Sequence, residues 1–113
     1  MIHSHDVNAV ALAVYQEARG EPFQCQVLVA SVVKNRMKDE KKSGYAVITQ
    51  YGQFTWNHRS KVHDWKSYAR SQKVAAYVLK SPQVAPYRFF KVGHRGGHVC
   101  GGQVFSVKYN RKK

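Results

Sequence analysis

Residues 15–22 read Tyr15-Gln16-Glu17-Ala18-Arg19-Gly20-Glu21-Pro22, and this run predicts the end of one helix and the start of another. Gly20 is the residue type that most easily adopts the left-handed conformation just past a helix end. Pro22 suits the first turn of the following helix, where its missing N–H is no loss. We therefore expect Glu17 in the last turn of one helix and Glu21 at the start of the next.

Glu17 is the candidate general acid of the chain. The macrodipole places about half a negative charge at a helix C-terminus, which predicts a raised pKa for Glu17, whereas nearby Arg19 lowers that pKa. A carboxyl group that stays protonated near neutral pH is what cleavage of a sugar acetal requires. Taken alone, the same stretch also fits a polar turn with two surface acids.

The composition indicates one globular domain over residues 1–113. Hydrophobic residues make up 43% of the chain and aromatic residues 12%, which is too many for a disordered protein. No apolar run reaches the roughly 18–20 residues of a membrane span, so we expect no transmembrane segment. Met1 to Asp6 lacks the basic and apolar regions of a signal peptide. We expect synthesis in the cytoplasm, after which another factor releases or carries the protein to its target.

The charge is strongly positive, with 19 Lys and Arg against 6 acids and a formal net charge of +13. Such a field favours a polyanionic partner, which could be nucleic acid, an anionic envelope polymer or a membrane face. The chain has two cysteines, Cys25 and Cys100, and this number neither requires nor excludes a bridge. Cys25 falls among apolar helical positions, which favours a small buried side chain.

Hydrophobic periodicity predicts three helices and two strands. The helices cover residues 6–18, with Ser4 or Asp6 as N-cap, then 22–37, and then 65–80 after Asp64 as N-cap. A solvated charged run, residues 38–42, and a short element around Val47-Ile48 separate the second helix from the third. Residues 87–92 and 104–109 are β-like, and the Gly-rich residues 93–102 predict the long loop of a β-hairpin. The fold class is therefore α+β, mainly α.

An aromatic and amide-rich segment precedes the third helix. Within it, the amides of Gln50, Gln53 and Asn57 alternate with the rings of Tyr51, Phe54 and Trp56. Rings stack on sugar faces while amides bond hydroxyl groups, so the mixture suits a carbohydrate groove. It also suits stacking of single-stranded bases, or simple burial in a core.

Two groupings of residues could carry chemistry. Glu17 is one, and the other acids have simpler explanations as caps, as the start of a helix or as part of a solvated run; a single acid favours a mechanism with one carboxylate. His94, His98 and Cys100 are the other, and they could hold zinc with His58 or His63 as a fourth ligand. Their spacing matches no common zinc motif, so we predict no metal.

The sequence resembles the cell wall hydrolase family named after the spore cortex-lytic enzyme. That family shows an E-A-R-G-E-P turn, a V-A-x-V-V-x-N-R helix and a G-Q-F-[ST]-W motif. The corresponding residues are Glu17-Ala18-Arg19-Gly20-Glu21-Pro22, Val29-Ala30-x-Val32-Val33-x-Asn35-Arg36 and Gly52-Gln53-Phe54-Thr55-Trp56. Similar hairpin motifs are Tyr87-Arg88-Phe89-Phe90 and Gly101-Gly102-Gln103-Val104-Phe105. The resemblance spans nearly the whole chain.

This resemblance implies a lysozyme-like fold with a small C-terminal β-hairpin, peptidoglycan as the substrate, and lytic transglycosylase or muramidase activity. Glu17 would be the catalytic acid/base, and no cofactor is expected. A transglycosylase would leave a 1,6-anhydro-muramoyl end. The residues implied in substrate binding are Tyr15, Glu21, Gln53, Phe54, Trp56 and Tyr87.

The chain departs from the family in one motif, because Gln103 stands where the hairpin carries a histidine. A short, basic module without a signal peptide resembles a bacteriophage endolysin or a virion-associated lysin, and we expect a monomer. The alternative from another class is a basic nucleic-acid-binding module or a small metal-dependent nuclease using His94, His98 and Cys100. The basic residues are dispersed without a recognition-helix signature, so we expect no specific nucleic acid partner.

Overall fold

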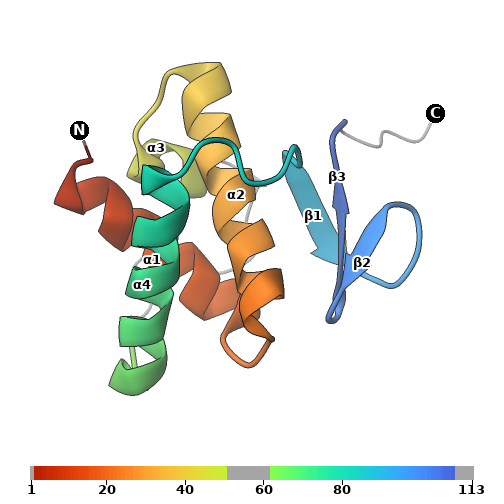
Figure 1. Cartoon of the computed structure of the whole chain (residues 1–113), viewed down its shortest axis with the longest axis horizontal. Coiled ribbons are helices and arrows are strands. Elements are labelled where there is room, and N and C mark those ends of the chain that lie inside the picture. Colours follow the sequence, from red (N-terminus) through yellow and green to blue (C-terminus); the bar gives the residue numbers. More distant parts are fainter. Residues whose placement is uncertain (1, 51–61, 109–113) are drawn as a thin grey trace.

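The computed structural model describes residues 2–50 and 62–108, and it is mainly helical (Figure 1). Four helices are formed by α1 (Ser4–Ala18), α2 (Phe23–Glu40), α3 (Gly44–Ile48) and α4 (Trp65–Lys80). Three strands follow, which are β1 (Phe89–Val92), β2 (His98–Cys100) and β3 (Gln103–Ser106). No helix in the described ranges is long and apolar enough to cross a membrane.

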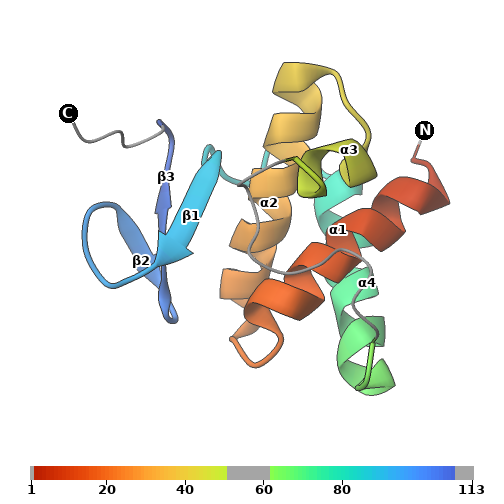
Figure 2. The ribbon, with the colours of Figure 1, turned by 180° about the vertical axis from the view of Figure 1, so that it is seen from behind.

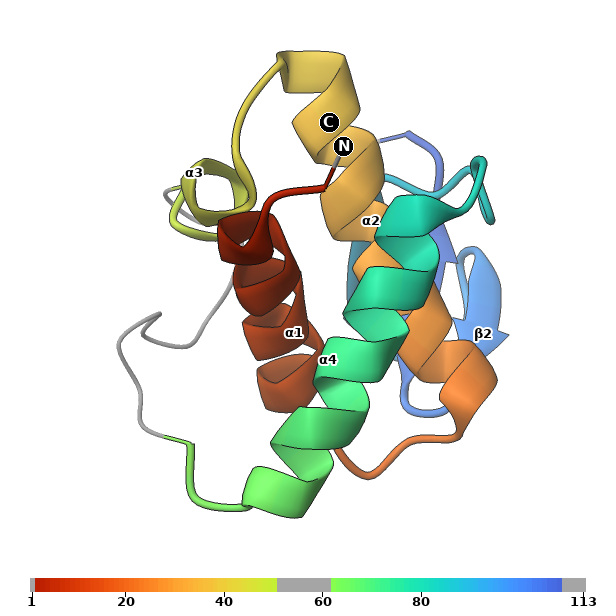
Figure 3. The ribbon, with the colours of Figure 1, turned by 60° about the vertical axis from the view of Figure 1, so that its left-hand side comes forward.

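Helix α1 forms the centre of the helical part. It packs against α2, α3 and α4, and Figure 3 shows it beside α3 and α4. Because partners lie on several sides, its apolar residues do not form a single stripe: Val10, Ala11, Ala13 and Val14 are all 0% exposed. The predicted helix over residues 6–18 is confirmed and begins two residues earlier, at Ser4.

The turn after α1 differs from the prediction in its details. Gly20 is not among the glycines with positive φ, and Arg19 at the C-cap is right-handed, so the helix ends without a left-handed residue. Pro22 lies just before α2 as its N-cap, with extended backbone, instead of in the first turn. Its carbonyl accepts the N–H groups of Cys25 and Gln26 at 3.0 and 3.1 Å.

Two predicted helix caps have different outcomes. Asp64 is the N-cap of α4, where its carboxylate accepts the backbone N–H of Ser67 at 3.0 Å. The prediction that Ser4 or Asp6 caps α1 was wrong, because the N-cap is His3 and makes no side-chain cap bond. Asp6 instead accepts the N–H of Gly44 at 2.9 Å, so its carboxylate serves the start of α3.

The charged run after α2 is partly helical, which corrects the prediction of a loop over residues 38–42. The helix continues to Glu40 and ends at Lys41, whose φ of 54° is left-handed and whose N–H bonds to the Met37 carbonyl. An Arg36–Glu40 ion pair at 3.3 Å spans one turn and favours this extension.

The strands form one antiparallel sheet in the order β1-β3-β2. Phe90 pairs with Phe105 across β1 and β3, and Cys100 pairs with Gln103 across β2 and β3. The predicted two-stranded hairpin was incomplete, because β2 lies inside the segment that we expected to be a loop. Gly101, at the β2–β3 turn, has φ +61°, which favours glycine.

The sheet stands to one side of the helices and meets them along α2 (Figures 1 and 2). Phe105 is 0% exposed and joins the hydrophobic core of the helices. A disulfide between Cys25 and Cys100 connects the first turn of α2 to the end of β2. Cys25 is therefore buried, as expected, but as half of a bridge rather than as a small apolar side chain.

Candidate active site

All six acids of the chain lie within the described residues, and four of their carboxylates have clear local roles. Asp6 and Asp64 hold backbone N–H groups at helix starts. Two hydrogen bonds from Ser67, one from its hydroxyl and one from its N–H, hold the pKa of Asp64 below its usual value. An acid whose pKa is lowered is ionised at neutral pH and cannot donate a proton there.

Asp39 and Glu40 are also tied to basic groups. The hydrogen bond from Arg88 to Asp39, at 2.7 Å, lowers the pKa of Asp39. Burial raises the pKa of Glu40, but hydrogen bonds from Gln50 and Arg36 and the nearby positive charges lower it more, so the net direction is downward. These contacts hold Asp6, Asp39, Glu40 and Asp64 in local structural roles.

Glu17 lies in the last turn of α1, as predicted, and its side chain is half-buried. Its carbonyl oxygen accepts a hydrogen bond from Nε2 of Gln103, the first residue of β3, at 3.0 Å. Gln26 Nε2 donates to the next two carbonyls, those of Ala18 at 3.1 Å and Arg19 at 3.4 Å. The backbone around Glu17 is therefore fixed from both α2 and the sheet.

Glu21 lies between this helix end and the sheet. Its N–H donates to the Ala18 carbonyl at 3.0 Å, which continues the turn after α1. Its carboxylate lies against Gly101, where a Cβ atom would overlap Oε1 of Glu21. Glu21 therefore occupies the junction between the α1–α2 turn and the β2–β3 turn.

Tyr15 is buried in the structure, and its predicted part in substrate binding stays a prediction. The residue is 1% exposed, and its hydroxyl oxygen accepts the N–H groups of His63 at 3.0 Å and Asp64 at 2.9 Å. Burial raises the pKa of Tyr15, but these two bonds and the Arg19 guanidinium, 4.3 Å from the ring centre, lower it more. Tyr15 therefore anchors the start of α4.

Tyr87 lies in an aromatic cluster on the sheet side. Its ring stacks on His98 with 5.6 Å between centroids and lies 6.0 Å from Phe105. Its carbonyl accepts Nδ2 of Asn35 at 2.9 Å, which fixes this segment to α2. The other three predicted substrate-binding residues, Gln53, Phe54 and Trp56, lie outside the described residues, and their roles stay predictions.

The alternative zinc site of His94, His98 and Cys100 lacks one of its expected ligands. Cys100 is bonded to Cys25 and has no thiolate to offer, and His98 is stacked on Tyr87. Among the described residues, no group of three or more His, Cys, Asp or Glu side chains is arranged to hold a metal ion.

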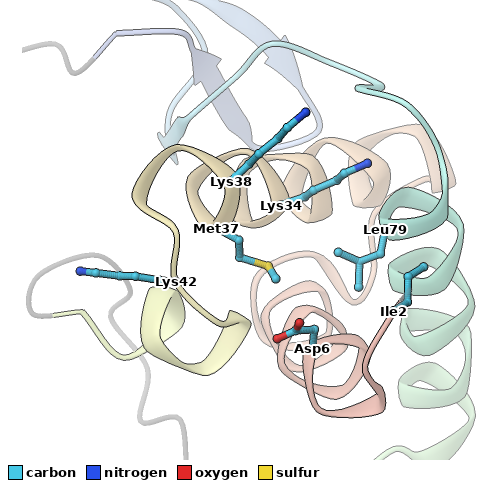
Figure 4. A pocket seen from close by; sticks show the side chains of 7 residues that line it. All are labelled: Ile2, Asp6, Lys34, Met37, Lys38, Lys42 and Leu79. Carbon is cyan, nitrogen blue, oxygen red and sulfur yellow. The ribbon is translucent and has the colours of Figure 1, made fainter.

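A surface hollow of about 280 Å³ lies at the other end of α1, beside Asp6 (Figure 4). Apolar side chains of Met37 and Leu79 line it, and Lys34 at its edge donates to the Val78 carbonyl at 2.9 Å. None of the predicted site residues lies in it, so we assign it no part in catalysis.

Sequence reasoning missed two residues next to Glu17. Gln26 sits among apolar positions of a buried helix face, which is a signal of a buried amide with a specific partner. Gln103 replaces the histidine of the family motif, and this replacement was the signal in the sequence that position 103 could have a specific role. Neither signal names the partner, because that partner is a backbone carbonyl distant in sequence.

Comparisons with known proteins place the sequence in a family. The sequence model of a family described as Cell Wall Hydrolase matches residues 20–91, which include Glu21 and Tyr87 and begin just after Glu17. The spore cortex-lytic enzyme of Bacillus subtilis (strain 168) is 50% identical over 34 residues, covering 30% of this chain and 11% of that protein. The spore cortex-lytic enzyme of Oceanobacillus iheyensis is 54% identical over 33 residues, covering 29% of this chain and 12% of that protein.

The chain thus spans only about a tenth of the length of these relatives, at 11% and 12%. No solved structure matches. The family match nevertheless covers well over half of the 113 residues. On that ground, this chain belongs to the cell wall hydrolase family.

Proposed function

We propose that this chain cleaves the glycan strands of peptidoglycan at the β-1,4 bond between N-acetylmuramic acid and N-acetylglucosamine, on a lysozyme-like fold. Membership of the cell wall hydrolase family supports the substrate class, and the names of the two relatives support it further. The observation that carries the proposal is the position of Glu17, half-buried in the last turn of α1 and next to the sheet.

Glu17 would act as the single acid and base. Its carboxylic acid protonates the glycosidic oxygen, the bond from that oxygen to C1 breaks, and positive charge develops at C1. The resulting carboxylate then removes the proton of the C6 hydroxyl, whose oxygen bonds to C1 and closes a 1,6-anhydro ring. Glu17 ends protonated, so no proton is gained or lost. Attack by water in place of the C6 hydroxyl would make the same site a muramidase.

The carboxylates support one acid rather than a catalytic pair. Asp6 and Asp64 each accept a backbone N–H, and Asp39 and Glu40 each pair with an arginine. Glu21, pressed against Gly101, would shape the site next to Glu17. Tyr87 would line the same region from the sheet side, and Gln53, Phe54 and Trp56 would supply the sugar-binding groove.

We extend the proposal to the setting of the enzyme. A net charge of +13 favours retention on anionic polymers of the bacterial envelope, and screening by salt would weaken this retention. The activity proposed is that of a monomeric lysin that serves bacteriophage-induced lysis without a cofactor.

The test is digestion of purified peptidoglycan, with released muropeptides identified by mass spectrometry. A transglycosylase gives products lighter by one water than the hydrolysed fragments. Glu17→Gln keeps the shape of the side chain and removes the proton-transfer group, so we expect lysis to fall at least about a hundredfold. Glu40→Gln is the matched control and should leave lysis unchanged. Undiminished lysis by a folded Glu17→Gln protein would overturn the proposal.

A further inference from the structure

Two buried glutamines hold the last turn of α1. Gln26 of α2 is 2% exposed and Gln103 of β3 is 5% exposed. Together their Nε2 groups donate to three consecutive carbonyl oxygens, those of Glu17, Ala18 and Arg19, at 3.0, 3.1 and 3.4 Å. The Gln103 bond joins two residues that lie 86 positions apart in the chain.

These carbonyls need partners from outside the helix. The last carbonyls of an α-helix have no N–H partner within the helix, and in many helices a left-handed residue just past the end brings N–H groups to them. Here Arg19 is right-handed and Gly20 is not left-handed, so that type of cap is missing. The Glu21 N–H reaches the Ala18 carbonyl, and the two glutamine side chains supply the other donors to this helix end.

Both glutamines also carry a buried atom that lowers the stability of the protein. The Oε1 atoms of Gln26 and Gln103 are buried, and within residues 2–50 and 62–108 neither has a hydrogen-bond partner. Burying an unpaired carbonyl oxygen destabilises a protein, whereas methionine has a similar length and carries no such atom. A buried side chain that keeps an unpaired polar atom where an apolar residue of similar size would fit is a common mark of a functional position.

We propose that Gln103 and Gln26 are positioning residues that act through Glu17. By holding the backbone of its helical turn from two directions, they keep the Glu17 carboxyl in one orientation toward the scissile bond. This inference rests on the proposed function of Glu17. Small displacements of a catalytic group reduce the rate strongly while leaving substrate contacts in place.

The test is steady-state kinetics on soluble, uncrosslinked glycan strands. Gln103→Met and Gln26→Met should each lower kcat at least about tenfold and change KM less than about threefold, because the substrate-contacting residues are untouched. Their urea unfolding midpoints should stay close to that of the parent protein. Gln72→Met is the matched control, since its amide bonds Asn8 at 3.2 Å on another part of α1, and its kcat should not change.

A conservative variant separates positioning from packing. Gln103→His should recover part of the kcat that Gln103→Met loses, since an imidazole N–H can donate to the same carbonyl. A folded Gln103→His protein as inactive as Gln103→Met would overturn the inference. So would a folded Gln103→Met protein with parental kcat, or one whose defect lies in KM alone. If Glu17→Gln is active, the proposed function fails instead, whatever the glutamine variants do.

Discussion

Removal of the Cys25–Cys100 bridge should cost this protein a large share of its stability. The bridge joins residues 75 positions apart, so it closes most of the chain into one loop. For a loop of that length the chain-entropy treatment gives about 4.5 kcal/mol of stabilisation at 25 °C, through restriction of the unfolded chain. Small domains have about 5–15 kcal/mol in total, so the reduced protein should be marginally stable.

Urea unfolding with and without a thiol reductant measures this difference. With a slope of about 1–3 kcal/mol per molar urea, a loss of about 4.5 kcal/mol moves the midpoint down by roughly 1.5–4.5 M. The double variant Cys25→Ala with Cys100→Ala is the control for reductant effects. It should unfold at the midpoint of the reduced parent protein, and adding reductant to it should change nothing.

A loss below about 1 kcal/mol would refute the reasoning. It would mean that the sheet and α2 restrain the chain without the bridge, or that the unfolded state is already compact. Near-ultraviolet circular dichroism reports on the damage, because the sheet carries Phe89, Phe90 and Phe105. We expect the sheet signals to weaken first.

Two further predictions concern the site junction and the acids. Gly101→Ala should lower both stability and lysis, because position 101 is left-handed and a Cβ there would displace the Glu21 carboxylate. Gly102→Ala is the control and should be tolerated, since a Cβ at position 102 has nothing within 4 Å to displace. Equal melting temperatures for the two variants would contradict this prediction. Stability should fall as pH drops, because the pKa values of Asp39, Glu40 and Asp64 are lowered in the folded state and the unfolded state therefore binds more protons. The contribution is complete above about pH 5 and is lost as pH falls below about 4. Urea titrations across this range measure the slope, and Arg88→Gln should make it shallower; a steeper slope would contradict the assignment to Asp39.

Local sequence signals located the helices well. The apolar spacing of residues 6–18 predicted α1, and the Asp64 cap predicted the start of α4, because helix starts depend on neighbours in the chain. The predictions failed where a group bonds a residue distant in the sequence instead of a neighbouring one. Asp6 resembles an N-cap in sequence, but Gly44 takes its carboxylate. Gly20 resembles a left-handed cap, but the Ala18 carbonyl accepts from the Glu21 N–H and from Gln26 instead.

Pairings over long distances were beyond sequence reasoning. Neither the count nor the spacing of Cys25 and Cys100 reveals a bridge, because pairing depends on how the sheet docks on α2. Strand β2 was missed for the same reason, since a three-residue strand amid glycines has no periodicity and exists through its register with β3. Glu17 could be predicted because its place at a helix end is local. Its surroundings could not.

The acid and the structure that holds it therefore come from different parts of the chain. The motif of residues 15–22 supplies Glu17, yet its helical turn is fixed by Gln103 across 86 positions, and its helix is fixed to the start of α4 by Tyr15 across 49. The disulfide adds a third connection across 75 positions. Loop closure disfavours each of these contacts alone, but the second and third cost less once the first has brought the segments together. A short motif can thus identify the family, whereas an active geometry requires the helices and the sheet to be assembled together.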